Sequence, residues 1–227
     1  KFIDSNSIMF DKGRPMKAIY FWNSREKRPG VLDWHPQYAE ISESGDFGYT
    51  TGPWTFRASP KDSVEARGQY STVWYLNKNG EWKFLVDFGI DNTQPGSDEE
   101  IIIDTPKEPE NTKEIPRKDS LIAAENSFNK LMGKNKDKAY KTWLSSKSIL
   151  TRNGFLPAAN SADRKIIIDS TPPGLMFSMN GKGISAVPDM GYTYGSVISI
   201  NGKPENYLHI WRREKSGWKI AVEVLRY

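Results

Sequence analysis

The sequence predicts an α+β protein made of two tandem domains, each with N-terminal helices packed on a curved antiparallel sheet. Two observations predict it. Residues 45–52 read GDFGYTTG and return as PDMGYTYG at residues 188–195, an offset of 143. In the second half of the chain, apolar residues at helical spacing come first, and the patterns of several short strands follow. Helices that cover one face of an antiparallel meander are typical of α+β domains.

Further blocks repeat downstream in the same order. Residues 70–74, YSTVW, match residues 207–211, YLHIW, at an offset of 137. Residues 79–83, NGEWK, then match residues 216–219, SGWK, with one residue fewer at the turn. Each pair combines a strand pattern with the turn that follows it, so the repeat indicates a shared strand order.

The match also reaches the start of the chain. Residues 2–13 align with residues 143–154 at an offset of 141. Four blocks in the same order are not a chance result, and they predict two copies of one domain. We therefore place the first domain at 1–92, a linker at 93–118 and the second domain at 119–227.

One helix is expected in the second copy only. Apolar residues at helical spacing predict it over 119–132, with Asp119 or Ser120 as N-cap. The spaced residues are Leu121, Ala124, Phe128, Leu131 and Met132. The first copy lacks a counterpart, because its match begins at Phe2. We expect that about 20 residues carrying this first helix preceded Lys1 in the gene product.

The other elements of the second domain follow from periodicity and turn signals. Helices are predicted over 137–147 and 161–168. Strands are predicted over 182–187, 190–200, 205–214 and 217–226, separated by the pairs Pro188-Asp189, Asn201-Gly202 and Ser216-Gly217.

The linker 93–118 has the composition of a solvated, semi-stiff tether. It holds four of the fourteen Pro residues, and seven acidic residues against four basic ones. Residues 101–103, three consecutive Ile, are too apolar for a free tether. We predict that they attach to one domain as an edge strand or plug.

Composition excludes several classes of function. The chain has no Cys and two His, so disulfides, thiolate catalysis and zinc or iron–sulfur sites are not expected, and neither is a cofactor or metal. It also lacks the nucleophile-elbow, P-loop, dinucleotide and zinc-protease motifs. No apolar run is long enough for a membrane span. An exported or periplasmic location is favoured over a cytoplasmic one, with any signal peptide upstream of Lys1.

Charge is distributed unevenly between the halves. Residues 119–227 carry a net charge of +7, to which Arg152 contributes, and residues 1–92 carry none. An anionic ligand or an acidic partner is one interpretation, and a solvated helix face is the more common one. Aromatic residues are not interleaved with these Lys residues, so nucleic-acid binding is not expected.

Several of these motifs resemble a known family. Trp34-x-Pro36, the GDFGYT block, Tyr70-x-Thr72-Val73-Trp74 and Gly80-Glu81-Trp82-Lys83 resemble SnoaL-like and ketosteroid-isomerase-like proteins of the nuclear transport factor 2 superfamily. The resemblance covers most of the first copy and, more weakly, the strands of the second, where Phe177-x-Met179 replaces Trp-x-Pro. It implies cone-shaped domains in which a ligand lies between helices and concave sheet. It does not imply one function, since this fold hosts isomerases, hydrolases, cyclases and binding modules.

Candidate ligand-binding residues follow from strand alternation and this resemblance. Alternation puts three residues of each copy on one face, and the resemblance directs that face into the cone. They are Tyr70, Thr72 and Trp74 in the first copy, and Tyr207, His209 and Trp211 in the second. Such a set suits a small apolar or partly polar ligand. The alternative is that the aromatic rings simply fill the cone as core.

His209 and Glu223 are the candidate catalytic residues. A His inside a pocket can act as acid or base near neutral pH, and Glu223, matched by Asp87, could assist it. The alternatives are a buried His bonded to backbone and a Glu on a solvated strand face. Asp46 and Asp189 occur in both copies, and each precedes a strand at a turn, where Asp caps backbone N–H groups.

The sequence therefore favours a small-molecule binding protein with an aromatic-lined pocket. The alternative is an isomerase, cyclase or hydrolase that transfers protons in the second pocket through His209. A third interpretation is a scaffold whose open sheet face binds another protein, which requires a large exposed apolar patch. We expect the two copies to pack as an internal pseudo-dimer, with a homodimer as the other assembly open to such a chain.

Overall fold

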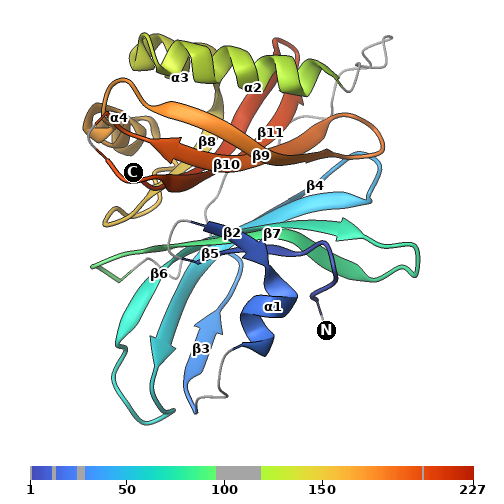
Figure 1. The fold of residues 1–227 in the computed structure, drawn as a ribbon, viewed down its shortest axis with the longest axis vertical. Coiled ribbons are helices and arrows are strands. Elements are labelled where there is room, and N and C mark those ends of the chain that lie inside the picture. Colours follow the sequence, from blue (N-terminus) through green and yellow to red (C-terminus); the bar gives the residue numbers. More distant parts are fainter. Residues whose placement is uncertain (1, 12–13, 25–28, 96–118, 201) are drawn as a thin grey trace.

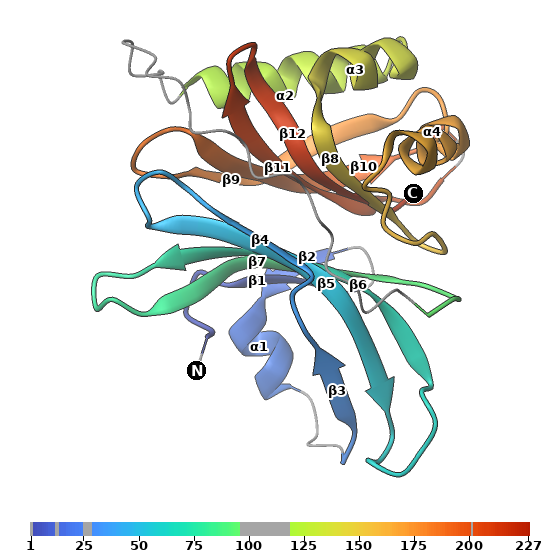
Figure 2. The ribbon, with the colours of Figure 1, turned by 180° about the vertical axis from the view of Figure 1, so that it is seen from behind.

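The computed structural model describes residues 2–11, 14–24, 29–95, 119–200 and 202–227. It confirms the α+β prediction. Two sheets lie face to face, α2 and α3 lie over the outer side of one, and α1 lies against the outer side of the other (Figures 1 and 2). Residues 101–103, with their predicted attachment, lie outside the described residues.

The described residues of the first half form a sheet of seven strands and one short helix. The strand order is β2-β1-β7-β6-β5-β3, and β4 also pairs with β5. The elements are β1 (Ile8–Asp11), β2 (Arg14–Lys17), α1 (Ala18–Asn23), β3 (Val31–Trp34), β4 (Tyr38–Ile41), β5 (Phe47–Arg57), β6 (Ala66–Leu76) and β7 (Trp82–Asp91). All described pairs are antiparallel except β1 with β7.

The described residues of the second half form a sheet of five strands and three helices. Its order is β8-β12-β11-β10-β9. The elements are α2 (Asp119–Met132), α3 (Lys136–Trp143), β8 (Leu144–Arg152), α4 (Ser161–Ser170), β9 (Met176–Ile184), β10 (Met190–Ile198), β11 (Glu205–Glu214) and β12 (Gly217–Leu225). The pair β8 with β12 is parallel and the other pairs are antiparallel.

Capping explains where two of these helices begin and end. The side chain of Asn135 accepts from Lys138 N at 2.9 Å, and that of Asn160 accepts from Asp163 N at 2.9 Å. Each bond satisfies a backbone N–H that a helix start leaves open. Lys136 Nζ donates to the carbonyls of Ile168, Asp169 and Thr171, so a cation stabilises the C-terminal end of α4.

Two predicted boundaries in the second domain are wrong. The helix predicted over 137–147 ends at Trp143, and Leu144 already pairs with Ile220 as the start of β8. The reason is the run from Ser145 to Thr151, which buries strand side chains against β12. The strand predicted over 182–187 is β9, which begins earlier, at Met176, because the whole segment pairs with β10.

The two sheets share two pairing features at positions that match in the sequence. Ile8 lies opposite Val86 in the first sheet, and Ile149, its match, lies opposite Val222 in the second. The register shift of β6 falls between Val73 and Trp74, and that of β11 falls at the matched pair of positions, Ile210 and Trp211. Pairing and irregularity thus follow the sequence repeat.

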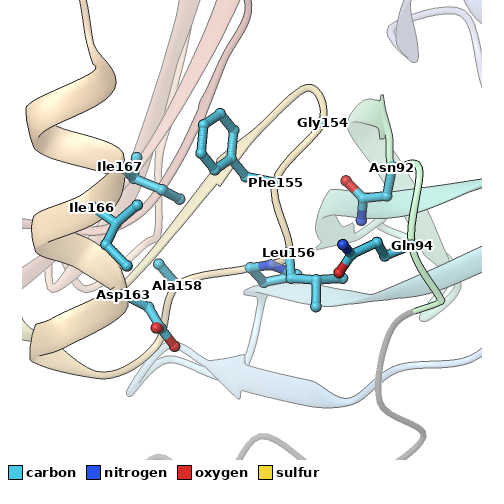
Figure 3. A pocket seen from close by; sticks show the side chains of 10 residues that line it. Asn92, Gln94, Gly154, Phe155, Leu156, Ala158, Asp163, Ile166 and Ile167 are labelled. Atoms are coloured by element: carbon cyan, nitrogen blue, oxygen red, sulfur yellow. The ribbon is translucent and has the colours of Figure 1, made fainter.

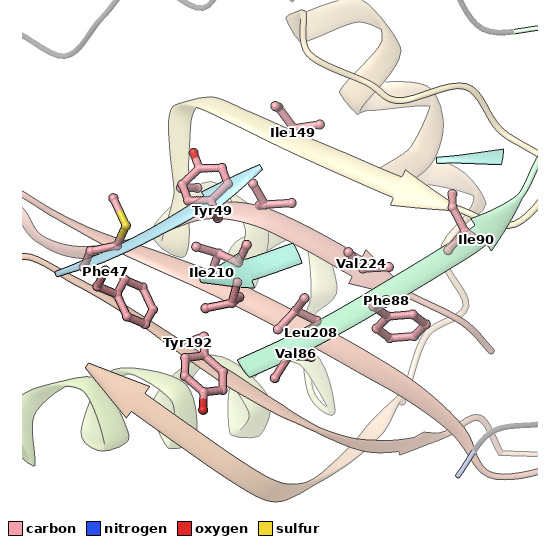
Figure 4. Packing of buried hydrophobic residues seen from close by; sticks show 14 residues of the cluster. Phe47, Tyr49, Val86, Phe88, Ile90, Ile149, Tyr192, Leu208, Ile210 and Val224 are labelled. Atoms are coloured by element: carbon pink, nitrogen blue, oxygen red, sulfur yellow. The ribbon is translucent and has the colours of Figure 1, made fainter. Parts of the chain in front are cut away.

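The core between the sheets joins the two halves. Side chains from both inner faces form one apolar cluster, shown in Figure 4. The first sheet contributes Phe47, Tyr49, Val73, Val86, Phe88 and Ile90; the second sheet contributes Ile149, Met190, Tyr192, Leu208, Ile210, Ala221, Val222 and Val224. Because each sheet gives one face to this cluster, a ligand that binds on a sheet face binds on an outer one.

Reciprocal hydrogen bonds cross the junction between the halves. The backbone N–H of Ala186 donates to both carboxylate oxygens of Asp46, at 3.3 and 3.2 Å, and that of Glu43 donates to Asp189 Oδ2 at 2.7 Å. The offset of 143 maps Glu43 onto Ala186 and Asp46 onto Asp189. The same kind of contact thus occurs twice, with the roles of the two halves exchanged. Both Asp residues cap backbone N–H groups at the junction.

The shared core predicts that the two halves unfold together. Ile210 has no exposed surface, and its replacement by Ala should cost about 2–5 kcal/mol and lower the midpoint of one common transition. Urea unfolding followed by fluorescence and by far-UV circular dichroism measures this. Ile200→Ala, at a side chain that is 72% exposed, is the control and should change stability by less than about 0.5 kcal/mol. Two separate transitions, only one of them shifted, would contradict the shared core.

Candidate functional site

A groove of about 450 Å³ opens on the outer face of the first sheet. Strands β3 to β7 and the segment before β1 supply its wall. The lining consists of Phe2, Trp34, Ala39, Glu40, Ile41, Gly48, Tyr49, Thr50, Trp74 and Trp82. Aromatic rings dominate the lining, and Glu40 is its one charged residue, so the groove suits apolar groups.

The aromatic residues hold one another in place. The Phe2 and Trp74 rings meet edge to face at 5.6 Å, and Trp34 meets Tyr70 in the same way at 5.4 Å. Trp74 Nε1 donates to Thr50 Oγ1 at 2.9 Å, which fixes the indole on the sheet. The groove is nevertheless open, since Trp34 is 48% exposed and Phe2 is 43% exposed.

Glu40 already has its partners and ties the groove to the second domain. Its carboxylate accepts from Arg212 Nη1 at 2.9 Å, from Tyr49 Oη at 2.6 Å and from Tyr38 Oη at 3.2 Å. Burial and the nearby Glu40 carboxylate raise the pKa of Tyr38 to about 12, so its hydroxyl remains a donor. Arg212 is bound further by Ser145 Oγ at 2.8 Å. Glu40 therefore stabilises the junction between the domains.

The three residues of the first domain that were predicted to bind ligand lie in different environments. Trp74 lines the groove. Tyr70 does not line it but packs against Trp34, and Thr72 Oγ1 donates to Asp87 Oδ1 at 2.7 Å. Burial raises the pKa of Asp87, and the Thr72 hydrogen bond opposes that effect. Asp87 is thus a carboxyl group without an ion-pair partner among the described residues.

The matching face of the second domain is filled. Tyr207, His209 and Trp211 have no exposed surface. Phe128 from α2 meets the His209 ring edge to face at 5.1 Å, and Phe177 from β9 meets Tyr207 in the same way at 5.1 Å. These rings serve as core here, as the alternative interpretation of the sequence had it.

His209 is held between two carboxylates. Its Nδ1 lies 3.0 Å from Glu125 Oε2, and its Nε2 lies 3.1 Å from Glu223 Oε2. Neither Glu has exposed surface. The expectation that such a buried His bonds to backbone is wrong, because two carboxylates occupy both ring nitrogens.

Two charged residues expected at the surface belong to this network. Glu223 accepts from Arg152 Nη2 and, at 3.0 Å, from Tyr140 Oη. The solvated-strand interpretation of Glu223 is therefore wrong. Arg152, grouped from sequence with the solvated positive charges, is 1% exposed and ion-paired. A buried strand face can carry these charges because each one has a charged partner.

Glu125 is the residue that sequence reasoning missed. It accepts from Thr193 Oγ1 at 2.6 Å, from Trp211 Nε1 at 3.1 Å and, at Oε1, from Asn129 Nδ2 at 2.8 Å. A signal existed, because Glu125 lies one turn after Leu121 and three residues before Phe128, within the apolar stripe of its helix. A carboxylate inside such a stripe indicates a buried polar partner.

The network balances its charges. Burial alone lowers the pKa of His209, but Glu125 and Glu223 raise it to about 9. Burial alone raises the pKa of Glu223, but Arg152 and His209 lower it to about 2. Two cations and two carboxylates are therefore charged at neutral pH and compensate one another. This arrangement stabilises the second domain.

A second cavity, of about 310 Å³, lies where the end of β7 approaches α4 (Figure 3). Two of its polar side chains, those of Asp163 and Asn92, already have hydrogen-bond partners within the fold. Asp163 Oδ2 accepts from the Asn160 side chain at 2.6 Å, and the Asn92 amide, in its hydrogen-bonding orientation, donates to Phe155 O at 2.7 Å. None of the residues predicted from sequence to bind ligand lines this cavity.

Membrane and metal features are absent from the described part of the chain. No described helix combines the length and hydropathy that a bilayer span requires. The described residues also contain no group of three or more His, Asp or Glu arranged to hold a metal ion.

Similarity to known proteins was found among solved structures, and those described below each cover less than half of this chain. No family model matches the sequence. No curated protein matches it either. Among solved structures, nuclear transport factor 2 from Cryptosporidium parvum is similar at 13% identity and a TM-score of 0.38, covering 46% of this chain and 89% of its own.

Two further solved structures are also similar to part of this chain at low sequence identity. A candidate dehydratase of the NTF2-like family from Streptomyces avermitilis is 14% identical, covers 48% of this chain and 93% of its own, and has a TM-score of 0.38. A candidate ketosteroid isomerase from Shewanella frigidimarina is 13% identical, covers 39% and 75%, and has a TM-score of 0.30. These similarities assign no ligand or reaction to this chain.

The His209 network predicts an alkaline loss of stability. The raised pKa of His209 means that its contribution is complete below about pH 6.5 and is lost as the pH rises through about 9. The lowered pKa of Glu223 means that its contribution is present above about pH 4.5 and is lost as the pH falls toward about 2. His209→Gln should therefore cost about 3–5 kcal/mol at pH 6 and flatten the alkaline limb.

Urea unfolding between pH 5 and pH 10 measures this effect. His35→Gln is the matched control, since His35 is the other His of the chain and is exposed. Equal alkaline limbs in the wild type and His209→Gln would show that the ring carries no charge in the folded state.

For Asp87 we predict the opposite pH dependence of stability. Its raised pKa means that ionisation weakens the folded state as the pH rises above the ordinary carboxyl range. Asp87→Asn keeps an acceptor for Thr72 and removes the charge, so its urea midpoint should exceed that of the wild type at pH 7 and approach it near pH 3. An unchanged midpoint at pH 7, measured beside the exposed control Asp62→Asn, would contradict the raised pKa of this half-buried carboxyl group.

Proposed function

We propose that this protein is a non-catalytic binding protein whose apolar or partly polar ligand occupies the groove of the first domain. The observation that carries the proposal is the contrast between the two outer sheet faces. One is filled by aromatic side chains and a helix, and the matched one presents Phe2, Trp34, Trp74 and Trp82 around open space.

The size and lining of the groove support a small molecule as ligand. Its volume of about 450 Å³ lies within the roughly 300–1,000 Å³ of small-molecule sites. The indole of Trp74 is fixed by Thr50, so it offers a rigid apolar surface at little entropic cost. Glu40 at the margin is occupied by Arg212, which leaves apolar burial as the main source of affinity.

The enzymatic alternative has less support. It requires His209 to meet a substrate, yet His209 and Glu223 have no exposed surface and both ring nitrogens face carboxylates. A general acid or base must come within hydrogen-bonding reach of the proton it transfers. Both ring nitrogens of His209 are paired within the network, which offers no such approach.

Trp74 provides the test of binding at the groove. Nile red, an uncharged dye that brightens in apolar surroundings, should bind the wild type, and Trp74→Ala should weaken its binding about tenfold because an aromatic wall is lost. Fluorescence titration measures both affinities. Trp22→Ala, at an indole on α1 that is 46% exposed and outside the groove, is the matched control. Equal affinities of wild type and Trp74→Ala for the dye would refute the groove as the binding site.

A further inference from the structure

The cavity between the end of β7 and α4 has walls from both halves of the chain. The first half supplies Asn92 and Gln94, and the second half supplies residues 154–158 together with residues of α4. Figure 3 shows Asn92 and Gln94 on one side of the cavity and Asp163 and Ile166 on the other. A molecule bound in this cavity therefore contacts both halves at once.

Hydrogen bonds hold the two walls against each other. Gly154 N donates to Asp91 O at 2.8 Å, and Asp91 N donates to Asn153 Oδ1 at 3.2 Å. Gly154 has a φ of 81°, a conformation that glycine adopts without strain, so this residue type suits the turn that carries one wall. The cavity is thus preformed, and a preformed site lowers the entropic cost of binding.

Apolar side chains make up most of the lining. Ala158 and Ile167 are buried in a small apolar cluster, and Phe155 packs against it. Leu156 and Ile166 border the same cavity and are 41% and 57% exposed. A ligand that covers these two side chains removes apolar surface from water, which favours binding.

Asp163 is the one charged residue of the lining. Its Oδ2 accepts from Asn160 Nδ2 at 2.6 Å, and no described residue provides a partner for Oδ1. The next two residues of α4 are cations that have other partners. Arg164 Nη1 donates to a backbone carbonyl at 2.9 Å, and Lys165 pairs with Asp169 at 2.6 Å. Among the described residues, the Asp163 carboxylate is therefore without a cation.

We propose that this cavity is a second ligand site, which binds a small molecule with an apolar body and a primary ammonium group. The ammonium group donates to Asp163 Oδ1 and supplies the missing positive charge. The apolar body lies against Leu156 and Ile166. This site shares no lining residue with the groove of the first domain, so the inference does not rest on the proposed function.

The size and exposure of the site set its affinity. Its volume of about 310 Å³ is at the lower end of the roughly 300–1,000 Å³ of small-molecule sites. Asp163 is exposed, so water and salt screen its charge, and an ion pair of this kind changes an affinity by only about threefold. The ligand is accordingly small, and apolar burial provides most of its binding.

Two probes of nearly equal shape test the requirement for charge. Phenethylamine is an ammonium ion at pH 7, and phenethyl alcohol carries a neutral hydroxyl in its place. We expect the amine to bind with a dissociation constant on the order of 1 mM, and the alcohol to bind about threefold more weakly at low salt. The difference should shrink at high salt.

Nuclear magnetic resonance titration of the isotope-labelled, 227-residue protein measures both affinities and locates the site. The backbone amide signals of Gly154, Leu156 and Ile166 should shift as either probe is added, because these residues line the cavity.

Variants on α4 separate the roles of charge and apolar surface. Asp163→Asn keeps the size of the side chain and removes its charge, so the two probes should bind this variant equally. Asp169→Asn, at an exposed residue of the same helix outside the cavity, is the matched control and should keep the threefold difference. Ile166→Ser should weaken both probes about threefold without changing their ratio.

Equal affinity of the wild type for the two probes would overturn the proposal, and so would a difference that persists in Asp163→Asn. An absence of shifts at Gly154, Leu156 and Ile166 would overturn it as well. Trp74→Ala should leave these shifts unchanged, because Trp74 lies in the groove. Failure of the dye to bind in the groove therefore leaves this second site standing, and failure of phenethylamine to bind here leaves the proposed function standing.

Discussion

The apolar packing between the two sheets is the constraint on which the rest of this structure depends. Residues of β5, β6 and β7 pack with residues of β8, β10, β11 and β12 in one cluster that contains Val73, Val86, Leu208 and Ile210. Strand alternation then directs the remaining side chains outward. Any ligand site on a sheet must accordingly lie on an outer face, where Trp74 and Trp211 are found.

The two outer faces meet the same requirement in different ways. Contact between aromatic side chains and water is unfavourable. An outer face that carries such side chains is therefore stabilised when another element or a ligand covers it. In the second domain α2 covers it, at the expense of burying Glu125, and the structure offsets that cost with His209 and, through Glu223, with Arg152. In the first domain Thr72 and Asp87 replace the charged pair, and the face stays open. Among the described residues, the matched positions of the first domain thus carry no cation, and this is also the face that stays open.

Much of the architecture was predictable because it is encoded locally. The repeat of the GDFGYT block, the Leu121–Phe128 stripe and the turns at 201–202 and 216–217 each depend on residues close in sequence, and the strands they delimit are those observed. Alternation places Trp74 with Tyr70 and Thr72 for the same reason. The end of the helix at Trp143 was not predicted, because β12, far away in the sequence, pairs with the residues that follow.

The sequence by itself determined the α+β class, the order of helices and strands, and the face of β6 and β11 on which the candidate residues lie, since periodicity and turn chemistry are properties of neighbouring residues. Only the tertiary structure decided that His209 and Glu223 are enclosed, that Arg152 is buried rather than solvated, and that Trp74 borders open space while Trp211 does not. Burial and charge compensation are set by what packs on a strand from elsewhere in the chain. Here that is α2, which brings Glu125 within hydrogen-bonding distance of a ring 84 residues away.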